Sequence, residues 1–297
     1  MDVQHEFDGS YRAVLQPAAG WLDPRAFVEA HSKASQSLGC EQINEDVVDL
    51  QRPGDNVHKK GSAKHPRWIV VTHEGNKLVC ASVVFALGAW TNLSKLLPEP
   101  INRLDLTLWG KTLYHLELDA ADARKLEGMA GVIIHPNAQR TVQSSVSYSG
   151  PKAADYFYFF PPVKYSPNIS RSEAFRVKIG HSPYDPLISD VDGADEREKL
   201  ANWMNGQGSV TADVMHRSKE FFDAKLREIF PHVKWKEGTI TTCVTTKTKD
   251  GEVFLGAFPN VAGVFLCAGC NGSGAAKAHE WGRMLSVLVR CEPKNLE

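Results

Sequence analysis

A glycine-rich turn near the C-terminal end constrains the fold of this chain more than any other segment. Residues 264–268 are a short apolar run, and Gly269, Gly272 and Gly274 follow it before a helical pattern at residues 274–290. A strand that passes through glycines into a helix leaves the first N–H groups of that helix without backbone partners and with a partial positive charge. Such a turn suits an electron-rich ring or a phosphate. Close packing of a parallel strand against a helix also requires glycines, so this structural role is an equal alternative.

Two further segments add to this pattern, one a strand that ends at a glycine and the other the start of a helix. Residues 83–87 are apolar and β-branched, and the run stops at Gly88, which Ala89, Trp90 and a Thr-Asn pair follow. Nearer the N-terminus, Asp23 precedes Pro24, which predicts an N-cap and the first position of a helix over residues 23–38. The order of the three segments is more specific than any one of them.

In this order the segments resemble the FAD-dependent amino-acid and amine oxidases, a family that includes monomeric sarcosine oxidase, pipecolate oxidase and the fructosyl amino-acid oxidases. The similarity is strongest over residues 20–50, 83–92, 156–180 and 242–282. It implies an α/β plus α+β fold, in which a Rossmann-like FAD-binding half is interleaved with an antiparallel-sheet substrate domain. Relatives begin with a strand, a Gly-x-Gly-x-x-Gly turn and a helix that hold the FAD pyrophosphate. No such pattern occurs in the 297 residues, so we expect an N-terminally shortened member.

Hydrophobic periodicity predicts the remaining elements. A long helix at residues 210–230 has one apolar stripe with Val214, Phe221, Leu226 and Ile229. We assign residues 1–100 and 241–297 to a partial FAD-binding domain and residues 101–240 to the substrate domain. Strands are expected at residues 47–50, 68–72, 78–86, 107–118, 131–135, 155–160, 174–180 and 264–268.

Composition and targeting patterns exclude several classes of protein. A formal net charge of −1 gives no reason to expect nucleic acid or an anionic membrane as a partner. No apolar run approaches the roughly 20 residues that span a bilayer. The first residues lack a basic-then-apolar pattern, and residues 294–297 are not a Ser-Lys-Leu type tail. We therefore expect a cytoplasmic protein with small-molecule partners, although relatives include peroxisomal proteins.

The six cysteines predict neither a disulfide framework nor a metal site. Cys267 and Cys270 have the spacing C-x-x-C, which occurs in zinc sites and in thioredoxin-like redox motifs. A zinc site needs two further ligands, of which none stands out, and a thioredoxin-like pair would open a helix early in the fold. The favoured expectation is that Cys267 closes a buried strand and Cys270 begins the turn.

The resemblance implies FAD contacts at several positions. Cys243 occupies the position where sarcosine oxidase-like enzymes attach FAD through its 8-methyl carbon, and an ordinary strand cysteine is the alternative. Val47 corresponds to a residue whose backbone meets the adenine, with a core valine as the alternative. The turn beside the isoalloxazine corresponds to Gly269, Gly272, Ser273 and Gly274, and the stretch near the adenosine diphosphate corresponds to Gly88, Ala89 and Trp90.

Four positions are implicated in substrate binding or catalysis. Lys277 corresponds to the lysine that holds the substrate carboxylate in relatives, but it falls one residue late, about 100° around the helix. Lys178 matches a lysine that promotes the reaction of reduced flavin with oxygen, and a solvent-facing lysine on an edge strand is the alternative. Tyr158 resembles a tyrosine that lines the substrate cavity, although an extra loop at residues 162–172 departs from the family pattern. His181 either faces the substrate or is simply exposed.

The activity that the resemblance implies is oxidation of a carbon–nitrogen bond in an amino acid or secondary amine. A hydride passes to flavin N5, the resulting imine hydrolyses, and molecular oxygen is reduced to hydrogen peroxide. The alternative is a non-catalytic remnant of such an oxidase that lacks stable FAD, which the absent pyrophosphate-binding turn favours.

Overall fold

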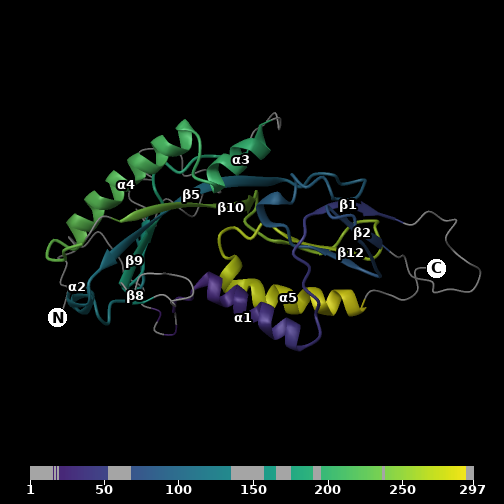
Figure 1. Ribbon diagram of the computed structural model, residues 1–297, viewed down its shortest axis with the longest axis horizontal. Coiled ribbons are helices and arrows are strands. Elements are labelled where there is room, and N and C mark those ends of the chain that lie inside the picture. The colour runs from purple at the N-terminus through teal and green to yellow at the C-terminus, as the bar shows by residue number, and fades with distance from the viewer. Residues whose placement is uncertain are drawn as a thin grey trace, which may run out of the picture. The chain divides into compact units, whose positions relative to one another are not determined.

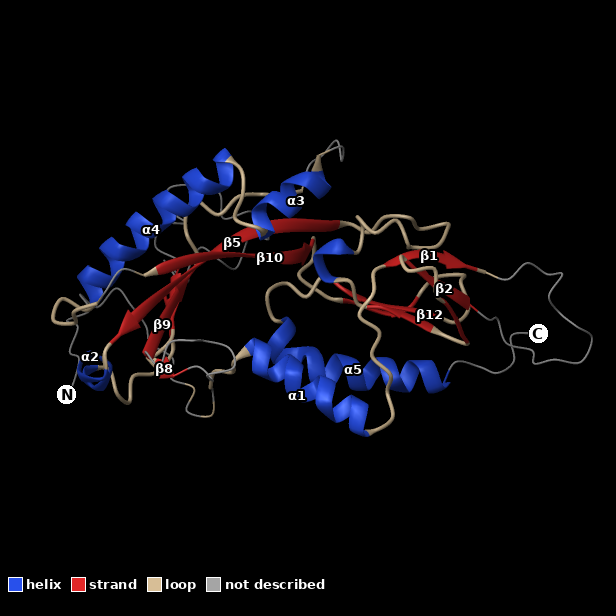
Figure 2. Ribbon diagram, viewed as in Figure 1, coloured by secondary structure: helices blue, strands red, loops and turns tan. Residues whose placement is uncertain are grey.

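The computed structural model describes residues 16, 18, 20–52, 68–134, 157–164, 175–189, 195–235 and 238–291. Over this part the chain has a mixed α/β arrangement with antiparallel sheets, as the sequence predicts (Figure 1). Helices and strands are distinguished by colour in Figure 2. The helices are α1 (Pro24–Ser37), α2 (Ala120–Lys125), α3 (Glu196–Met204), α4 (Ser209–Ile229) and α5 (Gly274–Cys291), and η2 (Gly88–Trp90) is a short 3-10 helix.

The strands of the described part form three sheets. In the largest sheet the order is β10 (Thr239–Thr248), β5 (Leu106–Leu118), β9 (Phe175–Gly180), β7 (Phe157–Phe159) and β6 (Val132–Ile134), with β8 (Val163–Lys164) paired to β9. A second sheet has the order β11 (Phe254–Ala257), β12 (Val264–Ala268) and β4 (Val83–Phe85). The third is an antiparallel meander of β1 (Val47–Gln51), β2 (Trp68–Thr72) and β3 (Lys77–Cys80).

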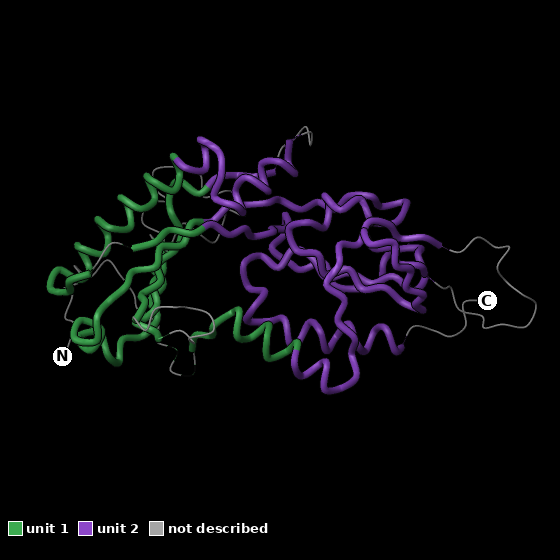
Figure 3. Tube along the Cα trace, in the orientation of Figure 1, with its two compact units in different colours: residues 1–32, 112–185, 213–241 green, residues 33–111, 186–212, 242–297 purple. Residues whose placement is uncertain are grey.

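The chain divides into two compact units (Figure 3). Unit 1 comprises residues 1–32, 112–185 and 213–241, and unit 2 comprises residues 33–111, 186–212 and 242–297. The long strands β5 and β10 each contribute residues to both units. The division into an FAD-binding domain and a substrate domain remains a prediction.

In unit 1 the antiparallel sheet buries one face against α4. Buried and half-buried positions alternate along the whole of β5, because successive side chains of a strand point to opposite faces. Tyr114 of β5 and Ile179 of β9 share one buried cluster with Leu226 of α4. Full burial of each large apolar side chain contributes roughly 1.5–3 kcal/mol. The polar side chains described below occupy the half-buried face of the same strands.

The predicted helices are confirmed, with one difference in the buried stripe of α4. Asp23 caps α1, because its Oδ1 accepts hydrogen bonds from the N–H groups of Arg25 (2.9 Å) and Ala26 (3.2 Å). In α4 the most deeply buried aromatic side chain is Phe222, whereas the predicted Phe221 is only partly buried. Val214 and Leu226 are buried as predicted, so the difference is confined to Phe222, which stacks on the buried ring of Tyr114 in place of Phe221.

In unit 2 the strand β12 lies at the centre of the second sheet. It pairs antiparallel with β11 and parallel with β4. Its continuous apolar sequence fits a strand covered on both faces, and Val264, Leu266 and Ala268 belong to the buried cluster that also contains Trp68. The Trp68 indole donates a hydrogen bond of 3.1 Å to the carbonyl oxygen of Ala262, which fixes the approach to β12.

The strand predicted over residues 78–86 is wrong in one respect, because it is two strands. β3 pairs antiparallel with β2, and β4 pairs parallel with β12. The chain leaves one sheet and joins another between Cys80 and Val83, where the Val83 N–H donates to the carbonyl oxygen of Gly263 (2.7 Å). Of the other predicted segments, the loop at residues 162–172 and the ends of the strands at 131–135, 155–160 and 174–180 lie partly outside the described residues.

Candidate functional site

Two predicted cofactor segments lie at one edge of the second sheet. Val83 pairs with Val264 and Phe85 pairs with Leu266, so β4 and β12 run in the same direction and end side by side. Gly88–Trp90 follows β4, and the glycine turn follows β12. In parallel sheets, ligands bind in the crevice beyond the carboxyl ends of the strands. The structure therefore brings together segments that are separated by more than half of the chain.

The glycines of the turn have different roles. Gly269 has φ +75°, and a Cβ atom there would collide with Thr248 Cγ2 and lie 3.0 Å from Leu106 Cδ2. Gly272 has φ +82°, and only Thr245 Cγ2, at 3.9 Å, would approach its Cβ. Both positions require glycine for backbone conformation, but only Gly269 is also packed against protein atoms. Gly272 leaves open space at the turn.

Asn271 fastens this turn to β10, a role that the sequence interpretation missed. Its N–H donates to the carbonyl oxygen of Thr246 (2.9 Å), and its Oδ1 accepts from the N–H of Thr248 (3.0 Å). Its Nδ2 donates to the carbonyl oxygens of Gly269 (2.6 Å) and Gly251 (3.0 Å). The available signal was an asparagine between glycines, because asparagine tolerates the left-handed conformation that residue 271 adopts with φ +52°.

Cys243 lies on the strand to which the turn is fastened. It is three residues before Thr246 on β10, a separation of about 10 Å along an extended strand. Its carbonyl oxygen accepts a 2.7 Å hydrogen bond from the indole of Trp203, and the Thr242 hydroxyl donates to the carbonyl oxygen of Trp203 (2.6 Å). The buried Trp203 side chain thus holds this part of β10. Cys243 itself is half-buried, and flavin attachment there stays a prediction.

The start of α5 presents helix N–H groups at the same edge. The N–H and hydroxyl of Ser273 both donate to the carbonyl oxygen of Cys270, at 2.9 and 3.0 Å, so this side chain is used within the turn. The Lys277 N–H donates to the carbonyl oxygen of Ser273 (3.2 Å), which begins the helix. N–H groups of the first turn, including that of Gly274, have no acceptor within a helix and carry partial positive charge. The Lys277 side chain is exposed, and its role as a carboxylate anchor stays a prediction.

The turn after β4 is compact and partly open. Gly88 has φ +55°, with no atom within 4 Å of a Cβ built on it. Its carbonyl oxygen accepts a 2.7 Å hydrogen bond from the buried Thr91 hydroxyl. Trp90 is 39% exposed, and the Arg197 guanidinium lies 5.8 Å from its ring centroid. The sequence interpretation missed Arg197, a cation from α3 beside the predicted diphosphate stretch. Val47 begins β1 in the separate meander and is 40% exposed.

The predicted substrate residues of unit 1 lie together on the half-buried sheet face. The ring of Tyr158 is 5.2 Å from that of His181, and Lys178 Nζ is 5.9 Å from the Tyr158 ring centroid. Gly180 makes room for this tyrosine, because a Cβ there would lie 2.6 Å from the phenol oxygen. The alternative of an edge-strand lysine is wrong, since β9 lies between β5 and β7. The catalytic roles of these residues stay predictions.

His115 adjoins this cluster and was also missed. It pairs with Lys178 across β5 and β9. Burial and the positive charges of Lys178, Arg176 and Arg25 lower the pKa of His115 to about 4. Its Nδ1 is buried and has no hydrogen-bond partner among the described residues. His115 is therefore a neutral imidazole at neutral pH, beside a lysine on a polar sheet face.

A protein-family model matches nearly the whole chain. The model described as "DAO: FAD dependent oxidoreductase" matches residues 2–288. The chain belongs to this family. The family prediction made from the sequence is thus confirmed.

Two solved structures of oxidases have a similar fold. A modified fructosyl peptide oxidase from Aspergillus nidulans has a TM-score of 0.55 and 15% identity, over 89% of this chain and 54% of that one. The fructosamine oxidase Amadoriase II from Aspergillus fumigatus has a TM-score of 0.54 and 15% identity, over 90% of this chain and 52% of that one. This chain thus spans about half the length of these structures. No curated protein matches it in sequence.

The edge of unit 2 fits the flavin ring of FAD. Thr245 Oγ1 lies beside the turn, is buried and has no hydrogen-bond partner among the described residues. A buried polar atom of this kind calls for a partner that the protein does not supply. Gly88 and Gly272 leave space for a ligand, and the start of α5 offers N–H donors. The Gly-x-Gly-x-x-Gly element that holds a pyrophosphate is absent from the printed sequence.

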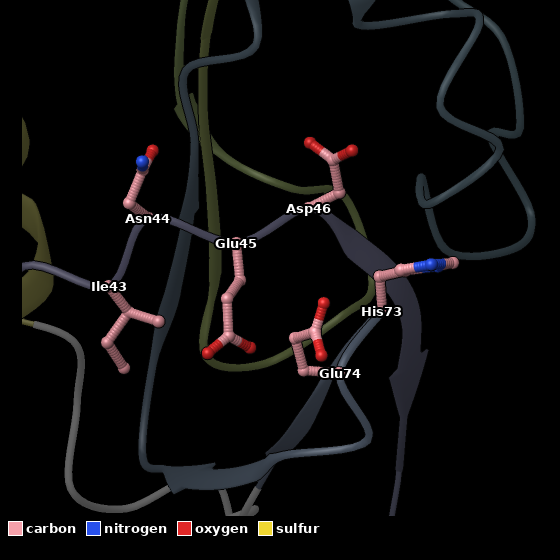
Figure 4. A pocket seen from close by; sticks show the side chains of 6 residues that line it. All are labelled: Ile43, Asn44, Glu45, Asp46, His73 and Glu74. Carbon is pink, nitrogen blue, oxygen red and sulfur yellow. The ribbon is translucent and has the colours of Figure 1, made fainter.

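A hollow at the meander does not suit an anionic cofactor. It is lined by Ile43, Asn44, Glu45, Asp46, His73 and Glu74, and Glu45 and Glu74 point toward the same space (Figure 4). Hydrogen bonds from the side chains of Thr72 and Asn76 hold the pKa of Glu45 below its usual value, so this carboxylate stays ionised. Like charge disfavours phosphate there. No group of three or more metal-ligating side chains occurs in the described ranges, and no helix there could cross a membrane.

Proposed function

We propose that this chain takes part in FAD-dependent oxidation of a carbon–nitrogen bond in an amino acid or secondary amine. The observation that carries the proposal is the paired ending of β4 and β12, which sets both glycine segments at one edge of unit 2. Family membership supports the redox chemistry. Two solved structures of similar fold are oxidases named for fructosyl peptides and fructosamines, both of which are amine derivatives.

The residues of unit 2 would hold and polarise the flavin. FAD, when bound, accepts a hydride from the substrate and passes the electrons to molecular oxygen, with hydrogen peroxide as product. Gly88 and Gly272 would let the backbone approach the ligand, and the hydroxyl of Thr245 would gain the hydrogen-bond partner that it lacks among described groups. The N-terminus of α5 would stabilise negative charge on the ring. Cys243 would be the point of covalent attachment.

The residues of unit 1 would act on the substrate and on oxygen. Lys178 would stabilise negative charge that develops on oxygen, and Tyr158 and His181 would line the substrate side of the sheet face. His115, which is neutral at physiological pH, would present an uncharged ring beside Lys178 on this sheet face. Lys277, which belongs to unit 2, would hold a substrate carboxylate. Orientation and charge placement, rather than a covalent intermediate on these side chains, would be the contribution of unit 1.

Reconstitution with FAD tests the proposal. Purified chain is mixed with FAD, freed of excess ligand and examined for visible flavin absorbance. Gly272→Ala should weaken FAD binding by at least about tenfold, or 1.4 kcal/mol, because its methyl group occupies the open turn. Gly75→Ala is the matched control, since Gly75 also has positive φ (+84°) and open surroundings but lies in the meander. Equal loss of FAD binding in both variants would argue against a flavin site at the glycine turn.

The second candidate function is a non-catalytic chain without stable FAD. It is favoured by the lack of a Gly-x-Gly-x-x-Gly element in the sequence and by the outer edge of β4, where Val84 is 43% exposed. An apolar hollow lined by Val84, Leu285 and Val289 lies beside that edge. A colourless protein after reconstitution, with no peroxide released from N-methyl amino acids or fructosyl amino acids, would favour this candidate. Acid precipitation of a coloured protein would show whether the colour remains with Cys243.

A further inference from the structure

Two cysteines at the end of β12 meet although their spacing in a strand would separate them. Cys267 is the fourth residue of β12, and Cys270 follows two residues after the strand ends. Side chains three apart in an extended strand point to opposite faces. Gly269, with φ +75°, interrupts that alternation, and the two thiols lie within hydrogen-bonding distance of each other. The turn itself therefore creates the pair.

The pair is accessible and its backbone is held in place. Both cysteines are free thiols and half-buried. Gly269 is packed against Thr248 and Leu106. Asn271, the residue after Cys270, is hydrogen-bonded to β10. A Cβ atom at Gly274 would lie 3.8 Å from Cys270 Sγ, so the missing side chain leaves room at that sulfur. A small oxidant can reach a pair whose geometry the protein already sets.

The two thiols are chemically unequal. A hydrogen bond from Cys267 lowers the pKa of Cys270 to about 7, and the same bond, together with burial, raises the pKa of Cys267. Cys270 also lies just before the N-terminus of α5, where partial positive charge favours a thiolate. At neutral pH Cys270 is the nucleophile, and Cys267 keeps its proton.

We propose that Cys267 and Cys270 form a reversible dithiol–disulfide site that reacts with hydrogen peroxide. The Cys270 thiolate attacks one peroxide oxygen, the O–O bond breaks, and a sulfenic acid forms with loss of one water after protonation. Cys267 then attacks that sulfur, its proton leaves with the hydroxyl as a second water, and the S–S bond closes. Both thiols are oxidised and one peroxide is reduced to two waters. A dithiol such as dithiothreitol reverses the step.

The inference extends beyond the proposed oxidase function, because it needs peroxide but no bound flavin. The disulfide would span Gly269 and close a very short loop at the turn that the proposed flavin site uses. Oxidation would thus change the residue immediately before Asn271. The Asn271 bonds to Thr246 and Thr248 of β10 lie outside the closed loop, whereas its bond to the carbonyl oxygen of Gly269 reaches into it.

Peptide mass spectrometry of the full chain tests the proposal. Trypsin cleavage after Lys249 and Lys277 gives one peptide that contains both cysteines and no other. Reduced native protein is treated with one equivalent of peroxide, blocked with a maleimide and digested. We expect the mass of this peptide to fall by two hydrogens and the peptide to resist the maleimide. Dithiothreitol should restore both the mass and the reactivity with the maleimide. The exposed Cys40 and Cys291 should remain reactive with the maleimide.

Rates and variants make the test sharper. The lowered pKa of Cys270 raises its thiolate fraction at neutral pH above that of an ordinary cysteine, so we expect Cys270 to be oxidised before Cys40. Cys267→Ser should leave a sulfenic acid at Cys270 that dimedone traps, and Cys270→Ser should leave Cys267 unoxidised. A native peptide that stays fully open to maleimide, or oxidation first at Cys40 and Cys291, would overturn the proposal.

Discussion

Replacement of Gly269 by alanine tests how tightly the glycine turn is held. The positive φ of +75° costs an L-residue about 1–2 kcal/mol. The added Cβ would also collide with Thr248 Cγ2 and press on Leu106 Cδ2, and overpacking of this kind costs about 1–3 kcal/mol. We therefore expect Gly269→Ala to lower the unfolding free energy of unit 2 by about 2–5 kcal/mol.

Gly272→Ala separates the two contributions. Gly272 has nearly the same φ, +82°, but the nearest atom to its added Cβ lies at 3.9 Å, an ordinary van der Waals contact. This variant has the backbone strain without the collision, so its expected cost is about 1–2 kcal/mol. The difference between the two variants measures how far Thr248 and Leu106 resist displacement.

The assay must report on one unit, because the chain has two compact units and a single global unfolding curve would mix them. Urea-dependent hydrogen exchange, followed by mass spectrometry on peptides of β4 and β12, isolates unit 2, and peptides of α4 and β9 serve as a unit 1 reference. Each 1.4 kcal/mol corresponds to about a tenfold loss of protection. Equal losses in Gly269→Ala and Gly272→Ala would refute the reasoning, since the packed side chains would then have moved aside without cost.

Three further substitutions test other contacts. Trp203→Phe removes the indole donor to the carbonyl oxygen of Cys243, so unit 2 should lose about 1–3 kcal/mol by the same exchange measurement; unchanged protection of β10 would contradict this. Tyr114→Phe removes a 2.6 Å hydrogen bond to the Asp223 carboxylate and should cost unit 1 about 1.5–3 kcal/mol, measured on α4 peptides. His115 has a folded pKa of about 4 against an ordinary 6.5, so its neutral form contributes fully above pH 6.5 and stability falls by up to about 3 kcal/mol as pH drops toward 4. His115→Gln should remove that pH dependence, and nuclear magnetic resonance titration of the ring would measure the pKa directly.

Features that depend on neighbouring residues could be predicted from the sequence. Asp23 and Pro24 specify the start of α1 through a side-chain cap and a fixed φ. The bounds of β2 and β12 follow from β-branched and apolar runs that end at polar residues or glycine. Each of these signals lies within a few residues of the structure that it determines.

Pairing between distant segments could not be predicted in this way. The run at residues 78–86 has one uninterrupted strand pattern, and only its two partners, β2 and β12, divide it between sheets. Helix α3 was missed because it buries a charged residue. Glu196 is 1% exposed, with its carboxylate bound to Arg103 at 2.8 Å and to the Ser189 hydroxyl at 3.1 Å. A hydrophobic pattern cannot identify a burial that depends on an ion pair ninety-three residues away.

The residues of the candidate site show the same difference between local and distant signals. Gly88 and Gly269 were recognisable because a strand that ends at a glycine before a helix is a local pattern. Arg197 and His115 matter only through contacts with distant segments, so no local pattern marked them. Asn271 stands between glycines, which is a local signal, but its bonds to β10 depend on a distant strand. Family resemblance supplied Lys178 and Tyr158, whose proximity in unit 1 agrees with a shared role without testing it.

The glycine turn is ordered by the protein itself, which bears on any ligand that it binds. Asn271 uses its N–H, its side-chain oxygen and its side-chain nitrogen within the turn and β10, and Gly269 is fixed by packing. A ligand that meets such a surface loses little free energy to ordering the protein, so binding depends on the contacts that the ligand itself makes. The open space at Gly272 and the buried hydroxyl of Thr245 are then the groups whose substitution should change affinity most. Weak flavin binding would consequently indicate missing contacts to the rest of the ligand, rather than a turn that has failed to form.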